Sequence, residues 1–136
     1  MVKPIERDRF FLSQKSEPAT REDAPVIRDL EDTLNANKEE CVGMAANMIS
    51  VLKRIIIVDA GAENLVMVNP VIRAKSGRYE TDEECLSLDG SRKTERWQTI
   101  EVEYEDRNFV KRHGKFEGWV AEVIEHEIDH CNGILI

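Results

Sequence analysis

The chain has 136 residues, of which 41% are hydrophobic and 34% charged, and its formal net charge is −8 at pH 7. This length suits one domain with one core, so we expect a single domain over residues 1–136. The negative charge argues against nucleic-acid binding, which needs a basic patch, and no apolar run is long enough to span a membrane. The start of the chain, MVKPIERDRF, lacks the apolar core of a secretory signal, and we therefore expect a cytoplasmic protein.

Residues 1–20 are polar and irregular, and the first helix is predicted to follow them, from Ala24 to Lys38. Apolar residues recur within it at spacings of three and four, which places them on one face of a helix. Asp23 is in position to cap its N-terminus, and Pro25 is tolerated in a first turn. The apolar stripe consists of Val26, Ile27, Leu30 and Leu34.

The middle of the chain predicts strands. A β-branched run that starts at Arg54 is typical of a buried strand, and the next strand is predicted to bend at Pro70. The one dense basic stretch, residues 91–96, is interpreted as a solvated turn. Together with a final helix, these segments indicate an α+β fold whose strands are mostly antiparallel. The further predicted strand segments are residues 64–75, 78–88, 97–106 and 108–118.

The last helix is predicted from Trp119 to Gly133, a natural C-terminal stop. On a helical wheel His126 and His130 lie at one edge of a broad apolar arc, and Glu127 falls inside that arc. A carboxylate in an apolar sector is costly to bury unless something pairs with it. The arc consists of Trp119, Val120, Val123, Ile124, Ile128 and Cys131, whereas Glu122, Glu125 and Asp129 are expected to face water.

The pattern His-Glu-x-x-His in this helix indicates a metal site. Residues i and i+4 share a face, so His126 and His130 can reach one ion, and Glu127 beside it can take a proton from water. One alternative stays open, in which both histidines are satisfied core residues and Glu127 bonds a core lysine or a backbone amide. A catalytic site needs a third protein ligand. Because His113 is expected to be exposed in a turn, Cys85, which lies among polar residues, is the better candidate.

Three segments together resemble the motifs of peptide deformylases. EECLSLDG, residues 83–90, resembles the family's E-G-C-L-S motif, and EHEIDHCNG, residues 125–133, resembles its Q-H-E-x-D-H-x-x-G motif. CVGMAANM, residues 41–48, resembles the first motif, G-x-G-Φ-A-A-x-Q, in which Φ is hydrophobic. The order of the motifs is that of the family, and the resemblance covers residues 20–133. It implies a peptide deformylase-like fold, with mostly antiparallel sheets packed around the C-terminal helix.

The resemblance also implies a chemistry for these residues. It makes Cys85, His126 and His130 the metal ligands and Glu127 the catalytic base and acid. The family's metal is Fe(II) in the cell, often replaced by Zn(II) or Ni(II) in preparations, and a Cys-His-His set suits those ions. The implied reaction removes the formyl group from the N-terminal formyl-methionine of new polypeptides. The implied partners are therefore N-formylmethionyl peptides, together with the ribosome.

The resemblance further implies how the substrate is held. The backbone N–H of Leu86 would donate to the formyl oxygen. Val123 and Met44 are pocket residues by position, and both suit an unbranched apolar side chain such as methionine. The substrate-binding residues implied in this way are Cys41, Gly43, Met44, Met48 and Val123.

Three positions depart from the family's motifs. Cys41 and Glu84 stand where the family has glycine, and Met48 stands where it has glutamine. A thioether cannot donate a hydrogen bond to the formyl oxygen, so we expect weakened activity. Asn47 could supply an amide only if the backbone is rotated, because neighbouring side chains of an extended segment point to opposite faces. The alternative function is a deformylase paralogue that binds metal and a peptide or another acylated ligand, with altered substrate or no catalysis.

Overall fold

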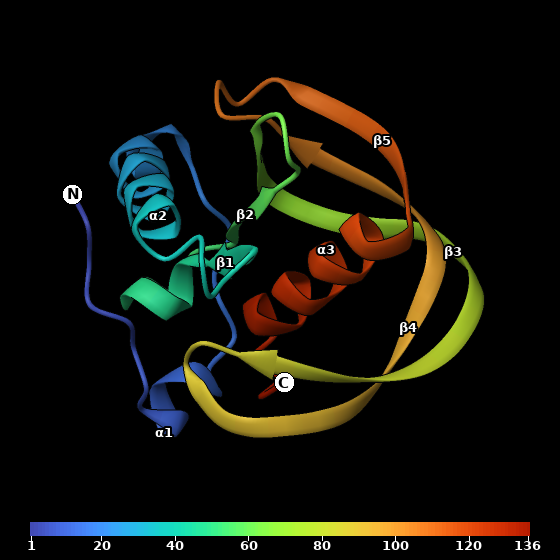
Figure 1. Ribbon diagram of the computed structural model, residues 1–136. Helices are drawn as coiled ribbons and strands as arrows, with labels where there is room; N and C mark the ends of the chain where they lie inside the picture. The colour runs from blue at the N-terminus through green and yellow to red at the C-terminus, as the bar shows by residue number, and fades with distance from the viewer.

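The computed structural model describes all 136 residues and shows one curved antiparallel sheet that encloses the C-terminal helix, with the other helices packed on the opposite side (Figure 1). The strands pair in the order β1-β2-β3-β4-β5, and every pairing is antiparallel, which confirms the predicted α+β class. The helices are α1 (Arg9–Leu12), α2 (Ala24–Ala36) and α3 (Gly118–Cys131), with 3-10 segments at Arg21–Asp23 and Ala46–Ile49. The strands are β1 (Gly43–Ala45), β2 (Ile55–Asp59), β3 (Asn64–Cys85), β4 (Leu88–Glu105) and β5 (Lys111–Glu117).

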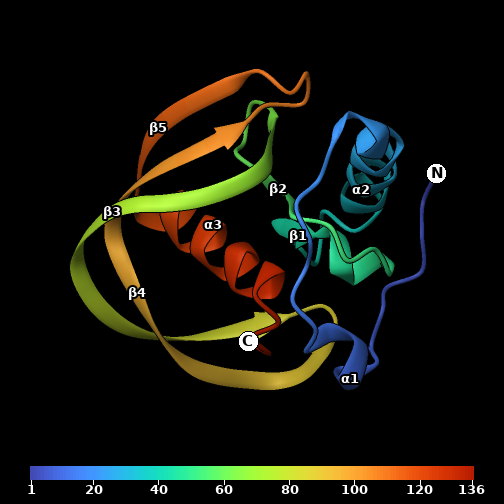
Figure 2. The same ribbon diagram turned by 180° about the vertical axis from the view of Figure 1, so that it is seen from behind.

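The hairpin of β3 and β4 is the largest feature of the sheet, and it curls around α3 (Figures 1 and 2). Its pairing register shifts between Val68 and Val71, between Ile72 and Ala74, and between Glu84 and Cys85. Such bulges bend a strand and increase its twist, which allows 22 residues of β3 to wrap a helix. The first shift contains Pro70, so the predicted bend there is confirmed. The segment predicted at 78–88 covers the end of β3 and the turn into β4, and the segment predicted at 97–106 covers the second half of β4.

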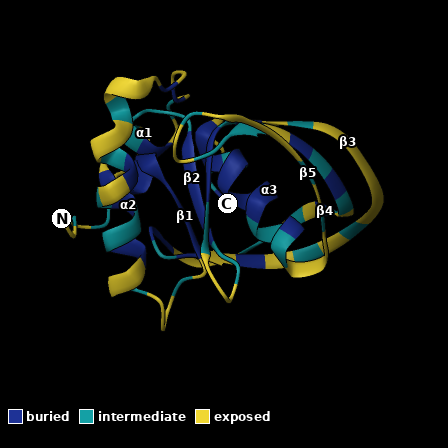
Figure 3. Cartoon of the chain, turned by 90° about the horizontal axis from the view of Figure 1, so that it is seen from above, coloured by how far each residue is buried: buried dark blue, intermediate teal, exposed yellow.

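Strand β2 is buried on both faces, as its unbroken β-branched run predicts. Its side chains alternate: Ile55 and Ile57 belong to a core cluster with α2 and the N-terminal segment, while Ile56 and Val58 belong to a second cluster with α3. The dark core in Figure 3 accordingly lies around β1 and β2, between α2 and α3. This layer anchors α3 on one side, and the β3–β4 hairpin encloses it on the other.

Helix α2 begins at Ala24, as predicted, and ends at Ala36, two residues before the predicted end. Its side chains Ile27, Leu30 and Leu34 are buried. Asp23 occupies the N-cap position, as predicted, although its side chain makes no capping hydrogen bond to the helix. Its carboxylate instead accepts a hydrogen bond from the backbone N–H of Thr20.

Three further predictions are corrected by the structure. The N-terminal segment is not wholly irregular, because it forms α1 and buries Leu12 completely. The basic stretch at residues 91–96 is part of β4 rather than a solvated turn, and Arg96 is buried. Glu125 does not face water, because the hairpin covers that side of α3 and the backbone N–H of Trp97 donates to its carboxylate. None of the helices has both the length and the apolar character needed to cross a membrane.

The end of α3 generates a stability prediction at Gly133. Its φ of 74° is left-handed, and a Cβ there would lie 2.4 Å from the backbone oxygen of Ser13. Gly133→Ala should therefore lower the free energy of unfolding by about 2–3 kcal/mol, as measured by urea denaturation. Gly61→Ala is the matched control, since its φ is 94° but no atom lies within 4 Å. It should cost about 1 kcal/mol, and equal losses for the two variants would contradict the role of Ser13.

Candidate metal centre

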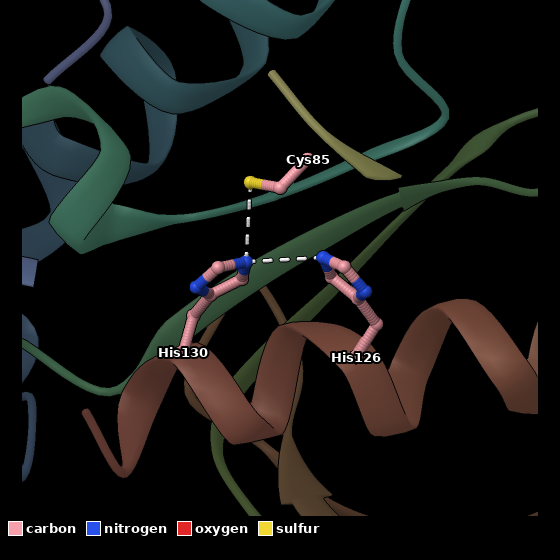
Figure 4. A group of neighbouring side chains, drawn as sticks. All are labelled: Cys85, His126 and His130. Carbon is pink, nitrogen blue, oxygen red and sulfur yellow. Dashed lines mark hydrogen bonds between the residues drawn. The ribbon is translucent and has the colours of Figure 1, made fainter. Parts of the chain in front are cut away.

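The structure brings together the cysteine and the two histidines of the candidate site (Figure 4). Cys85 ends β3, and His126 and His130 lie one turn apart on α3. The Cys85 Sγ atom lies 3.3 Å from His130 Nε2, which is itself 3.0 Å from His126 Nε2. All three donor atoms lie within 4.8 Å of one another. His113 is exposed, as expected, and lies outside this cluster.

The orientation of His126 suits metal binding. Its Nδ1 lies 2.7 Å from Glu83 Oε1, and because a carboxylate only accepts, this contact assigns the ring proton to Nδ1. The Nε2 lone pair is then directed at Nε2 of His130, and both rings are buried. The donor set therefore fits one divalent ion of the zinc or iron type, and Glu83 supplies the outer hydrogen bond typical of ligating histidines.

The two imidazoles differ in their affinity for a proton. Burial lowers the pKa of His126, but its interactions with Cys85 and Glu83 outweigh this effect and raise the pKa to about 10. Burial and the charge of His126 together lower the pKa of His130 to about 3. Positive charge is thus favoured at one imidazole and opposed at its neighbour. A metal ion bound by both rings would take the place of that proton, because ligating imidazoles are neutral.

A buried ion-pair network lies behind His126, and sequence reasoning missed it. Arg96 donates to both carboxylate oxygens of Glu83, at 2.8 and 2.7 Å, and to Asp129 at 2.8 Å. Burial raises the pKa of Glu83, but His126 and Arg96 reverse this effect and lower it to about 2. The strand period of two was an available signal, since Glu83 must share a face with Cys85.

Glu127 lies beside the metal cluster and is only 4% exposed. Its Oε1 atom is buried without a hydrogen-bond partner, and burial raises the pKa of the carboxyl to about 7. A structural hydrogen bond, the alternative left open by the sequence, is therefore not made by this oxygen. Both Glu127 and His126 line the same pocket. The position of Glu127 on the apolar arc thus directs a carboxyl into that pocket.

The pocket has a volume of about 350 Å³ and opens beside the candidate metal ligands. Gly43, the first residue of β1, allows α3 to pack closely against that strand. A Cβ at this position would lie 2.6 Å from Val123 Cγ1 and 3.1 Å from Glu127 Oε2. Met44 is completely buried in the core and does not line the pocket. The pocket-lining residues among those predicted for the site are Cys41, Gly43, Met48, Cys85, Leu86, Val123, His126 and Glu127. Three further residues named from the sequence, Glu84, Trp119 and Glu122, line it as well.

The first motif has an unexpected local structure. Residues 46–49 form a 3-10 segment, not the extended chain assumed from the sequence. Met48 lines the pocket although it is only 1% exposed. Asn47 is completely buried, and its Nδ2 donates to the backbone oxygen of His130 at 3.1 Å. Its amide therefore holds the end of α3 and is not directed at the pocket.

A His-Glu-x-x-His helix with a cysteine beside it, inside a curved antiparallel sheet, defines a metal-dependent hydrolase. The family model described as polypeptide deformylase matches residues 4–136, and a peptide deformylase of Clostridium beijerinckii is 57% identical over 136 residues, covering 100% of both chains. The chain belongs to the polypeptide deformylase family.

Solved structures agree with this assignment. A peptide deformylase from Legionella pneumophila has a TM-score of 0.88 at 30% identity, covering 99% of this chain and 83% of that one. A class I type b peptide deformylase from Acinetobacter baumannii, solved with Met-Ala-Ser bound, also has a TM-score of 0.88, at 27% identity. This match covers 99% of this chain and 97% of that one.

The network behind His126 generates a prediction for metal affinity. Glu83→Gln weakens the acceptor that orients His126, and it also removes the ion pair between residue 83 and Arg96. We expect the affinity for Zn(II), measured by chelator competition on folded protein, to fall by about 10–100-fold. Glu80→Gln is the control, because Glu80 is an exposed carboxylate on the same strand. An unchanged affinity in the Glu83 variant would contradict the orienting role.

Proposed function

We propose that this chain removes the formyl group from N-formylmethionyl peptides at the pocket beside Cys85, His126 and His130. One observation carries the proposal: three metal-type donors converge next to a buried carboxyl, Glu127, whose Oε1 has no partner. The Met-Ala-Ser complex of the Acinetobacter enzyme supports a peptide of this kind as the ligand.

Cys85, His126 and His130 would hold one divalent ion, Fe(II) in the cell, with Zn(II) or Ni(II) in preparations. When bound, such an ion supplies a Lewis acid that polarises a carbonyl and lowers the pKa of water. A thiolate with two imidazoles is a donor set that these ions share. The enclosure of both histidines excludes water from one side of the site.

Glu127 would move the proton that the reaction requires. Its carboxylate takes a proton from water as the water oxygen bonds to the formyl carbon. The same group then gives that proton to the amine nitrogen as the carbon–nitrogen bond breaks, and formate leaves. The backbone N–H of Leu86 would donate to the formyl oxygen, whose negative charge increases during the attack.

The remaining pocket residues would hold the peptide. Gly43 and Val123 pack closely against each other and form one wall of the pocket. Cys41 and Met48 also line it. Met44 would support these residues from the core and would not contact the peptide. Because Met48 cannot donate a hydrogen bond, the formyl oxygen would receive one side-chain donor fewer than in relatives with glutamine. We infer that turnover is weakened for this reason.

New polypeptides are the implied source of substrate, which places the proposed activity in the cytoplasm, with the ribosome as a partner. The direct test is formate release from formyl-Met-Ala-Ser by protein purified anaerobically with Fe(II). No release under these conditions would overturn the proposed function.

The proton-transfer role predicts the behaviour of Glu127→Gln. The variant should keep its metal, because Glu127 is not one of the proposed ligands. Its kcat should fall by about 10²–10⁴-fold, the usual contribution of a positioned acid–base group. Metal content and formate release would be measured on the same sample. Equal turnover in variant and parent would show that Glu127 does not move the proton.

The missing amide predicts a gain of activity. Met48→Gln should raise kcat by up to about 10²-fold, the typical value of one oxyanion donor, in the formate-release assay. Asn47→Ala serves as the comparison, because its amide already bonds the backbone of His130. It should lower metal affinity. If Met48→Gln gains nothing while Asn47→Ala loses turnover at full metal content, Asn47 is the donor and the proposed weakness is wrong.

A further inference from the structure

The imidazole of His130 has one nitrogen without a hydrogen-bond partner. Its Nε2 atom lies 3.3 Å from the Cys85 thiol and 3.0 Å from His126, whereas Nδ1 is buried and makes no hydrogen bond. Figure 4 shows this second nitrogen on the side of the ring that faces away from the cluster. A metal ion bound at Nε2 leaves the ring proton on Nδ1, because ligating imidazoles are neutral. His130 then carries a buried N–H donor that needs an acceptor.

Asn47 carries the complementary atom. It is completely buried in the 3-10 segment Ala46–Ile49, and its Oδ1 makes no hydrogen bond. Its Nδ2 donates to the backbone oxygen of His130 at 3.1 Å, so the amide already contacts this residue. The same contact fixes which end of the amide is which, because a backbone oxygen only accepts. An unpartnered donor and an unpartnered acceptor thus belong to two residues that touch.

The other unpartnered oxygens of the interior are less suited to this role. None of the residues that carry them makes a hydrogen bond to His130. Glu127 directs its carboxyl into the pocket, and Asn64 bonds to Glu31 and Asn35 near α2. The residues with such oxygens, apart from Asn47, are Ser16, Asn64, Ser87, Glu125 and Glu127.

We propose that Asn47 is a positioning residue for the metal site, whose Oδ1 accepts a hydrogen bond from Nδ1–H of His130 when that ring binds a metal ion. The inference rests on the proposed function, because it takes His130 as a ligand. Glu83 accepts from Nδ1 of His126 in the same manner, at 2.7 Å. Each histidine then has an outer acceptor of its own, which fixes the tautomer and the direction of the ring.

The first test is the 1H–15N spectrum of the histidine side chains in zinc-loaded protein. Nδ1 protons of both His126 and His130 should be visible, because an acceptor protects each from exchange with water. In Asn47→Ala the His130 resonance should be lost through exchange. The His126 resonance should persist, since Glu83 holds that proton, and it serves as an internal control.

The second test is the affinity for Zn(II), measured by chelator competition. Asn47→Ala should lower it by about tenfold, the lower end of the effect of an outer hydrogen-bond partner. Asn47→Asp keeps an oxygen acceptor but loses the amide donor to the backbone of His130, and its affinity should stay within about threefold of the parent. Asn64→Ala is the control, because Asn64 Oδ1 is also unpartnered but lies outside the metal cluster. It should leave the affinity unchanged.

Equal losses of affinity in Asn47→Asp and Asn47→Ala would overturn the proposal, because the bond to the backbone of His130 would then be the one that matters. A His130 Nδ1 resonance that survives in Asn47→Ala would overturn it as well. If circular dichroism shows that Asn47→Ala does not fold, the parent and Asn47→Asp decide, and a parent spectrum without a protected His130 Nδ1 proton contradicts the proposal. A parent protein that binds no Zn(II) would instead overturn the proposed function and its metal site.

Discussion

The buried contact between Arg96 and Glu83 is the interaction on which the site depends. Arg96 comes from β4, Glu83 from β3, and their partners His126 and Asp129 come from α3, so one network joins both strands to the helix. Glu83 and Cys85 share a face of β3, and fixing one against α3 therefore fixes the other. The same contact that orients His126 thus brings the thiol of Cys85 to His130.

Burying this network has an energetic cost that the fold must offset. The side chains of Arg96 and Glu83 are only 5% and 7% exposed, and removing buried ions from water costs several kcal/mol per ion before pairing. Two hydrogen bonds to Glu83 and one to Asp129 compensate the guanidinium. The arrangement does not maximise stability, since apolar residues often pack as well. The network is better explained by the site that it supports. A charged Glu83 holds the proton on Nδ1 of His126 and leaves Nε2 free to bind a metal ion.

Much of the fold was predictable where local patterns match tertiary surroundings. The β-branched run of β2, the stripe of α2 and the bend at Pro70 all follow from residues within a few positions of one another. The two histidines of the candidate metal site were predictable as well, because the spacing of His126 and His130 fixes a helical face. Cys85 was only a candidate from its polar surroundings, and the family resemblance was needed to make it the partner, since it lies 45 residues from His130 and no local pattern joins the two.

The failures share one physical cause, which is enclosure by distant parts of the chain. Arg96 looked solvated because its neighbours in sequence are polar, and Glu125 looked exposed because the helical wheel cannot include the β3–β4 hairpin. Asn47 was misjudged because residues 46–49 form a 3-10 segment that binds its amide to α3. Each of these three errors concerns a polar side chain whose partner lies far along the chain. Hydrophobic periodicity carries no information about such pairs.

Identifying the ligands of a bound metal ion is the most direct test of the proposed site. X-ray absorption spectroscopy of the zinc-loaded protein should show one sulfur at about 2.3 Å and two imidazole nitrogens at about 2.0–2.1 Å. The sulfur signal should come from Cys85 and disappear in Cys85→Ala, while it persists in Cys131→Ala. A coordination shell without sulfur, or one with two sulfurs, would contradict a site made of Cys85, His126 and His130.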